Sequence, residues 1–206
     1  MGGGRGWFVA LEGVEGSGKT TQAARLAERL RGAGRDVVEV REPGGTPLAE
    51  EARQMVLHGR DMPAAAELFL YLVARADLVT HVIAPALAAG RVVVADRFEL
   101  STRAYQAAGR GLDAAQVQGA IALAVGGVMP DLYVVLDVSP ETGRARQEAQ
   151  GKAPDRLERA APGFHNRVAE AFRAARGPNV AHVAAGDDAD TVHHAVWRIV
   201  QEQLPR

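Results

Sequence analysis

Eight residues near the N-terminus constrain this chain more than any other feature. Residues 13–20 read Gly-Val-Glu-Gly-Ser-Gly-Lys-Thr, which is a complete G-x-x-x-x-G-K-[ST] phosphate loop. An apolar run at residues 7–11 precedes the loop, and residues 21–30 place apolar side chains at helical spacing after it. This is the strand–loop–helix context that the motif requires. The chain is therefore predicted to bind a nucleoside triphosphate.

The chemistry of the loop assigns a role to each part. Its glycines let backbone N–H groups converge on phosphate oxygens, and the helix N-terminus adds a partial positive charge. Lys19 is expected to reach the β- and γ-phosphates, and the Thr20 hydroxyl to bind Mg²⁺. The alternative, a glycine-rich turn that matches by chance, is disfavoured by the flanking elements. The residues predicted to bind ATP are Gly13, Val14, Glu15, Gly16, Ser17, Gly18, Lys19, Thr20 and Thr21.

Bulk properties restrict the class of protein. The chain has 206 residues, which suits one α/β domain with a good core, and its net charge of −1 gives no basic field for nucleic acid. It has no cysteine, which excludes disulfides and thiolate metal sites. Its apolar stretches look too short, or too broken by charge, to cross a membrane. We expect a cytoplasmic protein whose residues 1–5 form a flexible leader ahead of the first strand.

Strand and helix patterns alternate along the chain. Such alternation predicts an α/β fold with a parallel sheet and helices on both faces, formed by a single domain over residues 1–206. Ligands of such sheets bind at the carboxyl ends of the strands. Strands are predicted at residues 7–11, 37–40, 91–95, 132–136 and 180–183, and helices at residues 21–30, 46–58, 64–89, 114–125, 141–150, 164–175 and 189–203.

Two motifs follow predicted strands. Residues 41–46 read Arg-Glu-Pro-Gly-Gly-Thr, a tight turn that could direct Arg41 at an anion, although read alone it is only a turn. Residues 96–98 read Asp-Arg-Phe. Asp96 is placed to hold the water shell of a metal, and Arg97 to fork onto a phosphate. The alternative, a surface Asp–Arg pair, fits poorly with the apolar strand that it ends.

The helix predicted from residue 64 carries Glu67, Tyr71 and Arg75 at spacings of four, which puts them on one face. Tyr71 could stack on a base while Arg75 donates to the edge of that base. Spacing alone favours a simpler interpretation, in which Tyr71 is a core residue beside a solvated arginine.

Cations gather between residues 144 and 158, and Gly151 and Pro154 interrupt the helix there. A mobile lid is predicted over about residues 144–158, whose cations could close over the triphosphate and offset charge on the transferred group. A solvated charged loop is the alternative.

Taken together, these motifs resemble the thymidylate kinase family, in particular its bacterial type, from residue 8 to about residue 203. The run at 41–46, the run at 96–98 followed by Ser101 and by Ala-Tyr-Gln at 104–106, and Asp-Arg-Leu-Glu at 155–158 occur in the family's order. The resemblance implies a phosphate-loop NTPase fold with a five-stranded parallel sheet, and a cytoplasmic homodimer. It also implies transfer of a phosphoryl group from ATP to dTMP with Mg²⁺, which yields dTDP for dTTP synthesis.

The resemblance further implies residue roles by position. Arg41 and Arg97 would bind the dTMP phosphate, Tyr71 would stack on thymine, Arg75 would bond its O4, and Glu12 would face the sugar 3′-hydroxyl. Ser101, Tyr105 and Gln106 would line the sugar and base pocket, with Tyr105 crowding a 2′-hydroxyl. The implied metal residues are Thr20 and Asp96, and the implied catalytic cations are Lys19, Arg97 and Arg156, with Arg144 and Arg146 as helpers.

This sequence departs from the family's pattern at three places. The stacking position is usually Phe, and here it is Tyr71, whose hydroxyl needs water or a partner. The phosphate loop carries Glu15 where some members have arginine, so the catalytic cation is expected from the lid. That lid has fewer arginines than the family pattern. Its Lys152 carries a point charge, whereas the planar guanidinium group of arginine can form two parallel hydrogen bonds to one phosphate.

Two other functions compete. A deoxynucleoside kinase would need a carboxylate base for a sugar hydroxyl, and Glu12 or Glu42 could serve. A nucleotide-binding switch or partition protein would hydrolyse ATP without a small acceptor. Such a protein would not need Arg41, Arg75 and Arg97 to converge on one pocket.

Overall fold

A parallel sheet forms the centre of the computed structural model, which describes residues 5–149, 151 and 155–205. In the described chain five strands pair in the order β2-β3-β1-β4-β5. Leu11 and Arg41 both pair with Asp96, so β1, β2 and β3 end in one row. The predicted α/β fold is confirmed. The strands are β1 (Phe8–Glu12), β2 (Val37–Arg41), β3 (Val92–Asp96), β4 (Leu132–Asp137) and β5 (Val180–Ala184).

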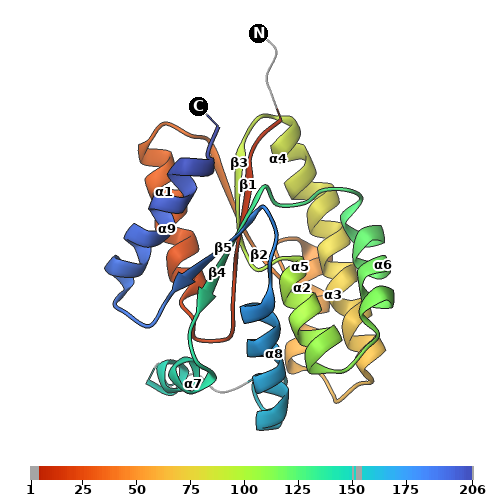
Figure 1. Ribbon diagram of the computed structural model, residues 1–206. Helices are drawn as coiled ribbons and strands as arrows, with labels where there is room; N and C mark the ends of the chain where they lie inside the picture. The colour runs from red at the N-terminus through yellow and green to blue at the C-terminus, as the bar shows by residue number, and fades with distance from the viewer. Residues whose placement is uncertain (1–4, 150, 152–154, 206) are drawn as a thin grey trace.

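Helices cover both faces of the sheet (Figure 1). On one face α1 (Lys19–Gly32) and α9 (Ala189–Gln203) pack on a core that includes Val9, Leu11 and Val134. The other face is covered by α2 (Pro47–His58), α3 (Ala64–Leu78), α4 (Ala84–Ala88), α5 (Glu99–Thr102), α6 (Ala114–Val125), α8 (Pro162–Ala174) and the π-helical segments η1 (Val79–Ile83) and η2 (Arg103–Gly109). The remaining helix, α7 (Pro140–Ala149), lies beyond the carboxyl ends of the strands, next to the phosphate loop.

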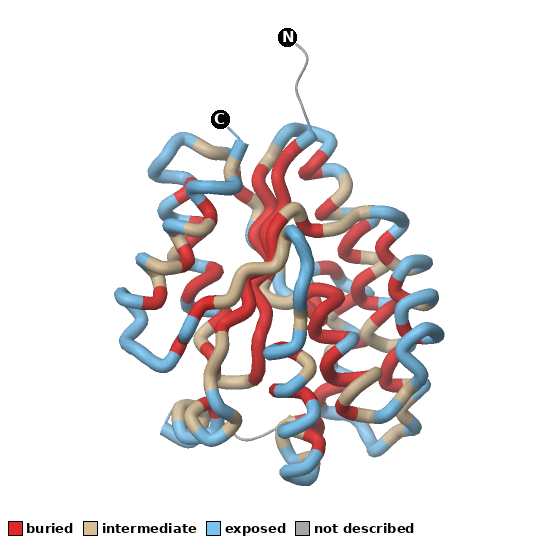
Figure 2. The backbone as a smooth tube through the Cα atoms, in the orientation of Figure 1, coloured by how far each residue is buried: buried red, intermediate tan, exposed pale blue. Residues whose placement is uncertain are grey.

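The three central strands, β1, β3 and β4, are the most continuously buried part of the described chain (Figure 2). Because side chains alternate along a strand, Phe8 and Ala10 of β1 enter one core while Val9 and Leu11 enter the other. This double burial explains why the central strands are apolar runs rather than alternating ones.

The helix predicted over residues 64–89 is continuous and consists of α3, η1 and α4. Pro85, which has no N–H, follows the π-helical turn at residues 79–83. Contrary to expectation, the run 64–88 is long and apolar enough by composition to cross a membrane. Its Glu67 and Arg75 side chains nevertheless form buried ion pairs inside the fold, which is the behaviour of a core helix.

One helical run is absent from the predictions. Residues 99–109 form α5 and η2, although Ser101, Thr102 and Arg103 give no clear apolar period. Tertiary packing against α8 stabilises this run, since Tyr105 contacts the rings of Phe164 and Phe172.

The N-terminal prediction needs one correction. Residues 1–4 of the predicted leader lie outside the described residues, but Arg5 is part of the fold. Its Nη1 donates to Asp131 Oδ1 at 2.7 Å.

Candidate active site

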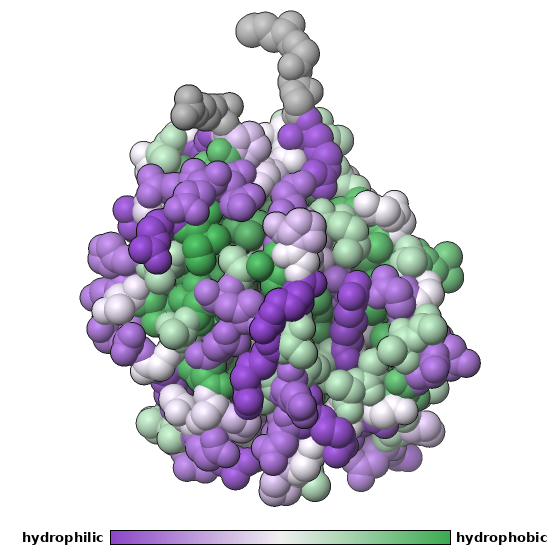
Figure 3. Space-filling view, in the orientation of Figure 1, coloured by the Kyte–Doolittle hydropathy of each residue, from purple (hydrophilic) through white to green (hydrophobic). Residues whose placement is uncertain are grey.

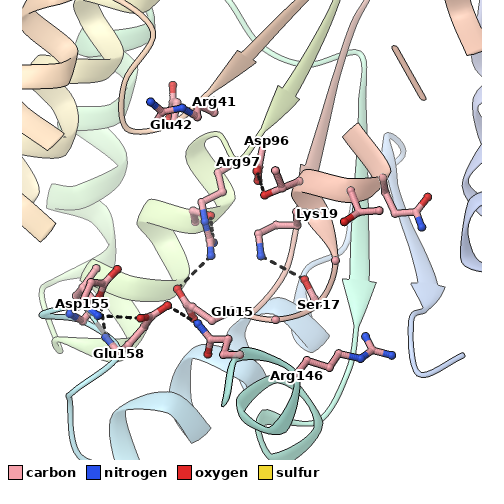
Figure 4. A pocket seen from close by; sticks show the side chains of 18 of the residues that line it. Glu15, Ser17, Lys19, Arg41, Glu42, Asp96, Arg97, Arg146, Asp155 and Glu158 are labelled. Carbon is pink, nitrogen blue, oxygen red and sulfur yellow. Dashed lines mark hydrogen bonds and ion pairs between the residues drawn. The ribbon is translucent and has the colours of Figure 1, made fainter. Parts of the chain in front are cut away.

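A cavity of about 990 Å³ opens at the carboxyl ends of the strands. The phosphate loop, the turn after β2, α3, the end of α5 and η2 all contribute to its wall, and so do parts of α7 and the segment from Asp155. Figure 4 shows that Lys19 and Arg97 point into the same space, with Arg41 and Arg146 on opposite sides of it. One site therefore gathers the motifs that the sequence places far apart.

The phosphate loop has the backbone that its glycines allow. Gly16 and Gly18 have positive φ values of 69° and 95°. A Cβ at Gly16 would come within 2.1 Å of the Gly143 carbonyl oxygen, so only glycine lets α7 pack on the loop. Lys19 Nζ donates to Val14 O at 2.6 Å and to Ser17 Oγ at 3.2 Å. Burial, together with repulsion from Arg97, lowers the pKa of Lys19 to about 8.

Thr20 and Asp96 meet at the mouth of the loop. Thr20 Oγ1 donates to Asp96 Oδ2 at 2.5 Å, and Asp96 Oδ1 is buried without a hydrogen-bond partner in the described structure. Hydroxyl and carboxylate oxygens beside a phosphate loop are ligands that suit Mg²⁺. No group of three or more His, Cys, Asp or Glu side chains among the described residues could hold a metal. These two residues therefore fit a Mg²⁺ ion held largely by the phosphates of a nucleotide.

Arg97 occupies a strained backbone position. Its φ is 74°, the one positive value among the described non-glycine residues, and such strain persists where surrounding contacts enforce it. Its Nη1 donates to Gly13 O at 3.1 Å and to Ser101 Oγ at 3.0 Å, and its Nη2 donates to Glu15 Oε1 at 3.1 Å. The guanidinium thus lies between the phosphate loop and α5, in the middle of the cavity.

Two more arginines form a cationic end of the cavity. Arg41 Nη2 donates to Glu50 Oε1 at 2.9 Å, and Arg53 Nη1 donates to Pro43 O at 2.6 Å. Partial burial and the neighbouring Arg41 charge both lower the pKa of Arg53. Two neighbouring guanidinium groups in a cavity wall repel each other. An anion bound between them would offset this repulsion and accept hydrogen bonds from both. Sequence reasoning missed Arg53, because only the fold of the turn after β2 brings α2 back over it.

Tyr71, Arg75 and Gln106 form another part of the cavity wall. Arg75 is 1% exposed, and Glu42 Oε2 accepts from its Nε at 2.8 Å and from its Nη2 at 2.5 Å. Its Nη1 donates to Thr102 Oγ1 at 2.8 Å, which leaves a second N–H of Nη1 with no acceptor in the described structure. Tyr71 and Arg75 share a helix face as predicted, but Arg75 is buried rather than solvated.

The structure places Glu15 rather than Glu12 in the cavity wall, although Glu12 was expected to face the sugar 3′-hydroxyl. Glu12 is fully buried and does not line the cavity. Its oxygens accept from Phe98 N, Ser101 N and Ser101 Oγ, and burial raises its pKa to about 7. Glu12 therefore anchors the start of α5 instead of lining the cavity. Glu15 lines the cavity and accepts a hydrogen bond from the Tyr105 hydroxyl.

The lid predictions also change. Arg156 is 7% exposed and turned away from the cavity, since its Nη2 donates to Glu67 Oε2 at 2.6 Å and its Nε to Val56 O at 2.9 Å. Arg144 lines a separate cavity of about 230 Å³ between α7, α8 and the phosphate loop. Arg146 does line the main cavity, where it donates to Ala185 O at 2.8 Å. Lys152 lies outside the described residues, so the mobility of the lid stays a prediction.

A phosphate loop, a metal-compatible pair and a second cationic end in one cavity define a phosphate-loop kinase whose acceptor is itself an anion. The family model described as Thymidylate kinase matches residues 11–196. The chain belongs to the thymidylate kinase family.

Individual relatives agree with this assignment. A thymidylate kinase of Synechococcus sp. (strain JA-2-3B'a(2-13)) is 47% identical over 201 residues, which cover 96% of each chain. One of Solidesulfovibrio magneticus is 45% identical and covers 96% of this chain and 100% of the relative. The crystal structure of thymidylate kinase from Ehrlichia chaffeensis matches with a TM-score of 0.76 and 30% identity over 96% of this chain and 99% of that chain.

Proposed function

We propose that this cytoplasmic enzyme transfers the γ-phosphoryl group of ATP to dTMP with Mg²⁺, yielding ADP and dTDP for dTTP synthesis. The observation that carries the proposal is that one cavity contains both the phosphate loop and a second anion site at Arg41, Arg53 and Arg97. Tyr71, Arg75 and Gln106 would take the thymine, and the wall from Arg146 to Ala189 would take the adenosine end of ATP.

The reaction needs no side-chain base. A phosphate oxygen of dTMP attacks the γ-phosphorus in line, a new P–O bond forms, and the bond to the β,γ-bridging oxygen breaks with its electrons leaving on ADP. Lys19 and Arg97 hold the two phosphates and offset the charge that develops between them. When bound at Thr20 and Asp96, Mg²⁺ supplies further charge neutralisation. Catalysis is then positioning plus electrostatic stabilisation.

The two candidate bases of the rival deoxynucleoside kinase are already occupied. Glu12 accepts from Ser101, and Glu42 holds Arg75, and both carboxylates are buried. Glu12 does not line the cavity, and Glu42, which does line it, is held through its Oε2 by the guanidinium group of Arg75. A phosphate acceptor fits the cavity better, because it is already anionic and meets three guanidinium groups.

Glu15 would take the sugar-facing role first expected of Glu12. Burial would raise the pKa of Glu15, but the charges of Arg97 and Lys19 and the hydrogen bond from Tyr105 outweigh it and lower the pKa. An ionised carboxylate only accepts hydrogen bonds, so it suits a sugar hydroxyl between the base and phosphate ends.

Formation of ADP tests the proposal. In a steady-state assay, we expect ADP formation to require both dTMP and Mg²⁺. ATP consumption at full rate without any monophosphate would instead support the switch or partition protein.

The pH dependence should follow Lys19. Since its pKa is about 8 in the free protein, Lys19 loses its charge as the pH rises through that value. We expect kcat/KM for ATP to fall above about pH 8, whereas kcat should fall only at higher pH, because bound phosphates favour the charged amine. Rate profiles between about pH 6 and pH 10 measure both limbs. A kcat/KM that stays level through this range would show that Lys19 remains charged.

We also propose a homodimer through α2 and α3. Leu48 and Met55 on α2 and Phe69 and Val73 on α3 are exposed apolar residues on helices that pack together. In contrast, the surface over α7 and α8 is mostly hydrophilic (Figure 3). An exposed apolar patch of this kind is suited to a partner surface.

Phe69→Lys should disrupt the dimer, because it puts a charge at the centre of a desolvated contact. Light scattering after size exclusion should show a dimer for wild type and a monomer for the variant. Gln201→Lys on α9 adds the same charge on the other face of the sheet and should leave the dimer intact. A wild-type protein that is monomeric at all concentrations would contradict this proposal.

A further inference from the structure

The Glu67 carboxylate, in the first turn of α3, is a fully buried group that the proposed mechanism does not use. Its Oε1 accepts from Gln106 Nε2 at 2.9 Å and from Arg110 Nε at 3.1 Å. Its Oε2 accepts from Arg110 Nη2 at 2.9 Å and from Arg156 Nη2 at 2.6 Å. One carboxylate therefore joins η2, the residue that follows it, and the segment after α7.

Glu67 is ionised in this arrangement. Burial would raise its pKa, but hydrogen bonds from Arg110, Gln106 and Arg156 outweigh the desolvation and place the pKa below its ordinary value. An ionised carboxylate accepts hydrogen bonds and donates none. Only the amino group of the Gln106 amide can therefore face Glu67.

The hydrogen bond from Gln106 Nε2 to Glu67 also fixes the position of the Gln106 carbonyl oxygen. Gln106 is 1% exposed and lines the main cavity. With Nε2 turned to Glu67, the carbonyl Oε1 is left as an acceptor, and no other group in the described structure donates to it. The amide is oriented by the charge of its neighbour rather than by space, since the two ends of an amide have nearly the same shape.

We propose that Glu67 is a positioning residue for base specificity, which holds the Gln106 amide so that its oxygen faces the base. An acceptor at this place pairs with the N3–H of thymine or uracil. Cytosine has an unprotonated N3, which is itself an acceptor, so it could not form a hydrogen bond with the Gln106 Oε1 acceptor. The inference rests on the proposed function, because it requires the base to lie beside Tyr71 and Gln106.

Charge balance sets Gln106 apart from the other partners of Glu67. Arg110 and Arg156 alone already supply more positive charge than one carboxylate needs, so the neutral amide is not required to compensate Glu67. Glu67 also lies one helical turn before Tyr71, so α3 carries both the stacking ring and the group that orients the acceptor.

The test compares kcat/KM for dTMP with kcat/KM for dCMP. In Glu67→Gln, residue 67 can present either an oxygen or an amino group, so Gln106 is free to rotate and to pair with cytosine. We expect the dTMP/dCMP ratio to fall about tenfold or more. Gln106→Leu, which removes the acceptor, should lower the ratio as well. Arg110→Gln is the matched control, because it weakens the same cluster but leaves Glu67 ionised, and its ratio should equal that of wild type.

A double variant guards against a simple failure to fold. Glu67→Gln with Gln106→Glu exchanges the two side chains and keeps the net charge, and its residue 106 carboxylate again presents an acceptor to the base. We expect this exchange to restore the preference for dTMP that Gln106→Leu loses, even if Glu67→Gln alone is unfolded.

The outcomes separate two failures. The role of Glu67 is overturned if Glu67→Gln lowers both substrates equally, if Arg110→Gln lowers the ratio as much, or if the folded exchange variant does not discriminate. A wild-type enzyme that phosphorylates dTMP and dCMP equally well would contradict the placement of the base itself, and with it both proposals.

Discussion

Lys19→Ala is expected to lower kcat by about a hundredfold or more while the fold survives. Among the described residues, the Lys19 amine donates only to Val14 and Ser17 of its own loop, so the core does not depend on it. Loss of a charged donor to the transferred phosphoryl group costs several kcal/mol of barrier at a preorganised site. Turnover at saturating substrates, with a thermal unfolding curve, measures both parts.

The matched control is Arg25→Ala on the same helix. Arg25 is partly exposed and pairs with Asp190, and neither residue lines the cavity. Its loss removes one cation from α1 but should leave kcat as in wild type. Near-wild-type turnover in Lys19→Ala would contradict the proposal that this lysine contacts the transferred phosphoryl group.

The second large effect concerns the base. We expect dTMP to exceed dCMP in kcat/KM by about 10⁴-fold, because a buried site built for one hydrogen-bonding pattern strongly rejects the reverse pattern. Arg75 offers an N–H where cytosine carries an amino donor, and Gln106 offers an oxygen where cytosine N3 is an acceptor. Uracil lacks only the methyl group, so dUMP should be about 10–200-fold poorer than dTMP.

Ribose TMP provides a control for the sugar. Tyr105 is buried beside Arg97, and its hydroxyl donates a hydrogen bond to Glu15. A 2′-hydroxyl on the sugar should therefore be disfavoured without any change in base preference. These four substrates are compared under one set of conditions. Equal kcat/KM values for dTMP and dCMP would refute the role of Arg75 and question the nucleotide pocket as a whole.

The parts of this enzyme that the sequence predicts well are those determined locally. The phosphate loop is defined by eight consecutive residues, and the three central strands β1, β3 and β4 are apolar runs buried on both faces, so their run length and turn signals suffice. The motifs that end β2 and β3 meet in the structure because Arg41 and Asp96 pair in register. The parallel arrangement of the strands is enough to predict that these two motifs lie close together.

The residues that sequence reasoning misplaced depend on long-range contacts. Glu12 and Glu15 are three positions apart, and only the fold shows that Ser101 binds the first while the second faces the cavity. Arg156 looked like a free cation of the lid, but its partner Glu67 lies 89 residues away. The helical run 99–109 is stabilised by Phe164 and Phe172 rather than by its own pattern.

The central claim is that the γ-phosphoryl group passes directly from ATP to dTMP. The most direct test follows this group through a single turnover. With enzyme in excess over ATP labelled at the γ-phosphorus, and with dTMP and Mg²⁺ present, the account predicts that the label passes to dTDP and that almost none appears as inorganic phosphate. Omission of dTMP should leave the label on ATP. Label released as inorganic phosphate at the same rate with or without dTMP would contradict direct transfer between two nucleotides in this cavity.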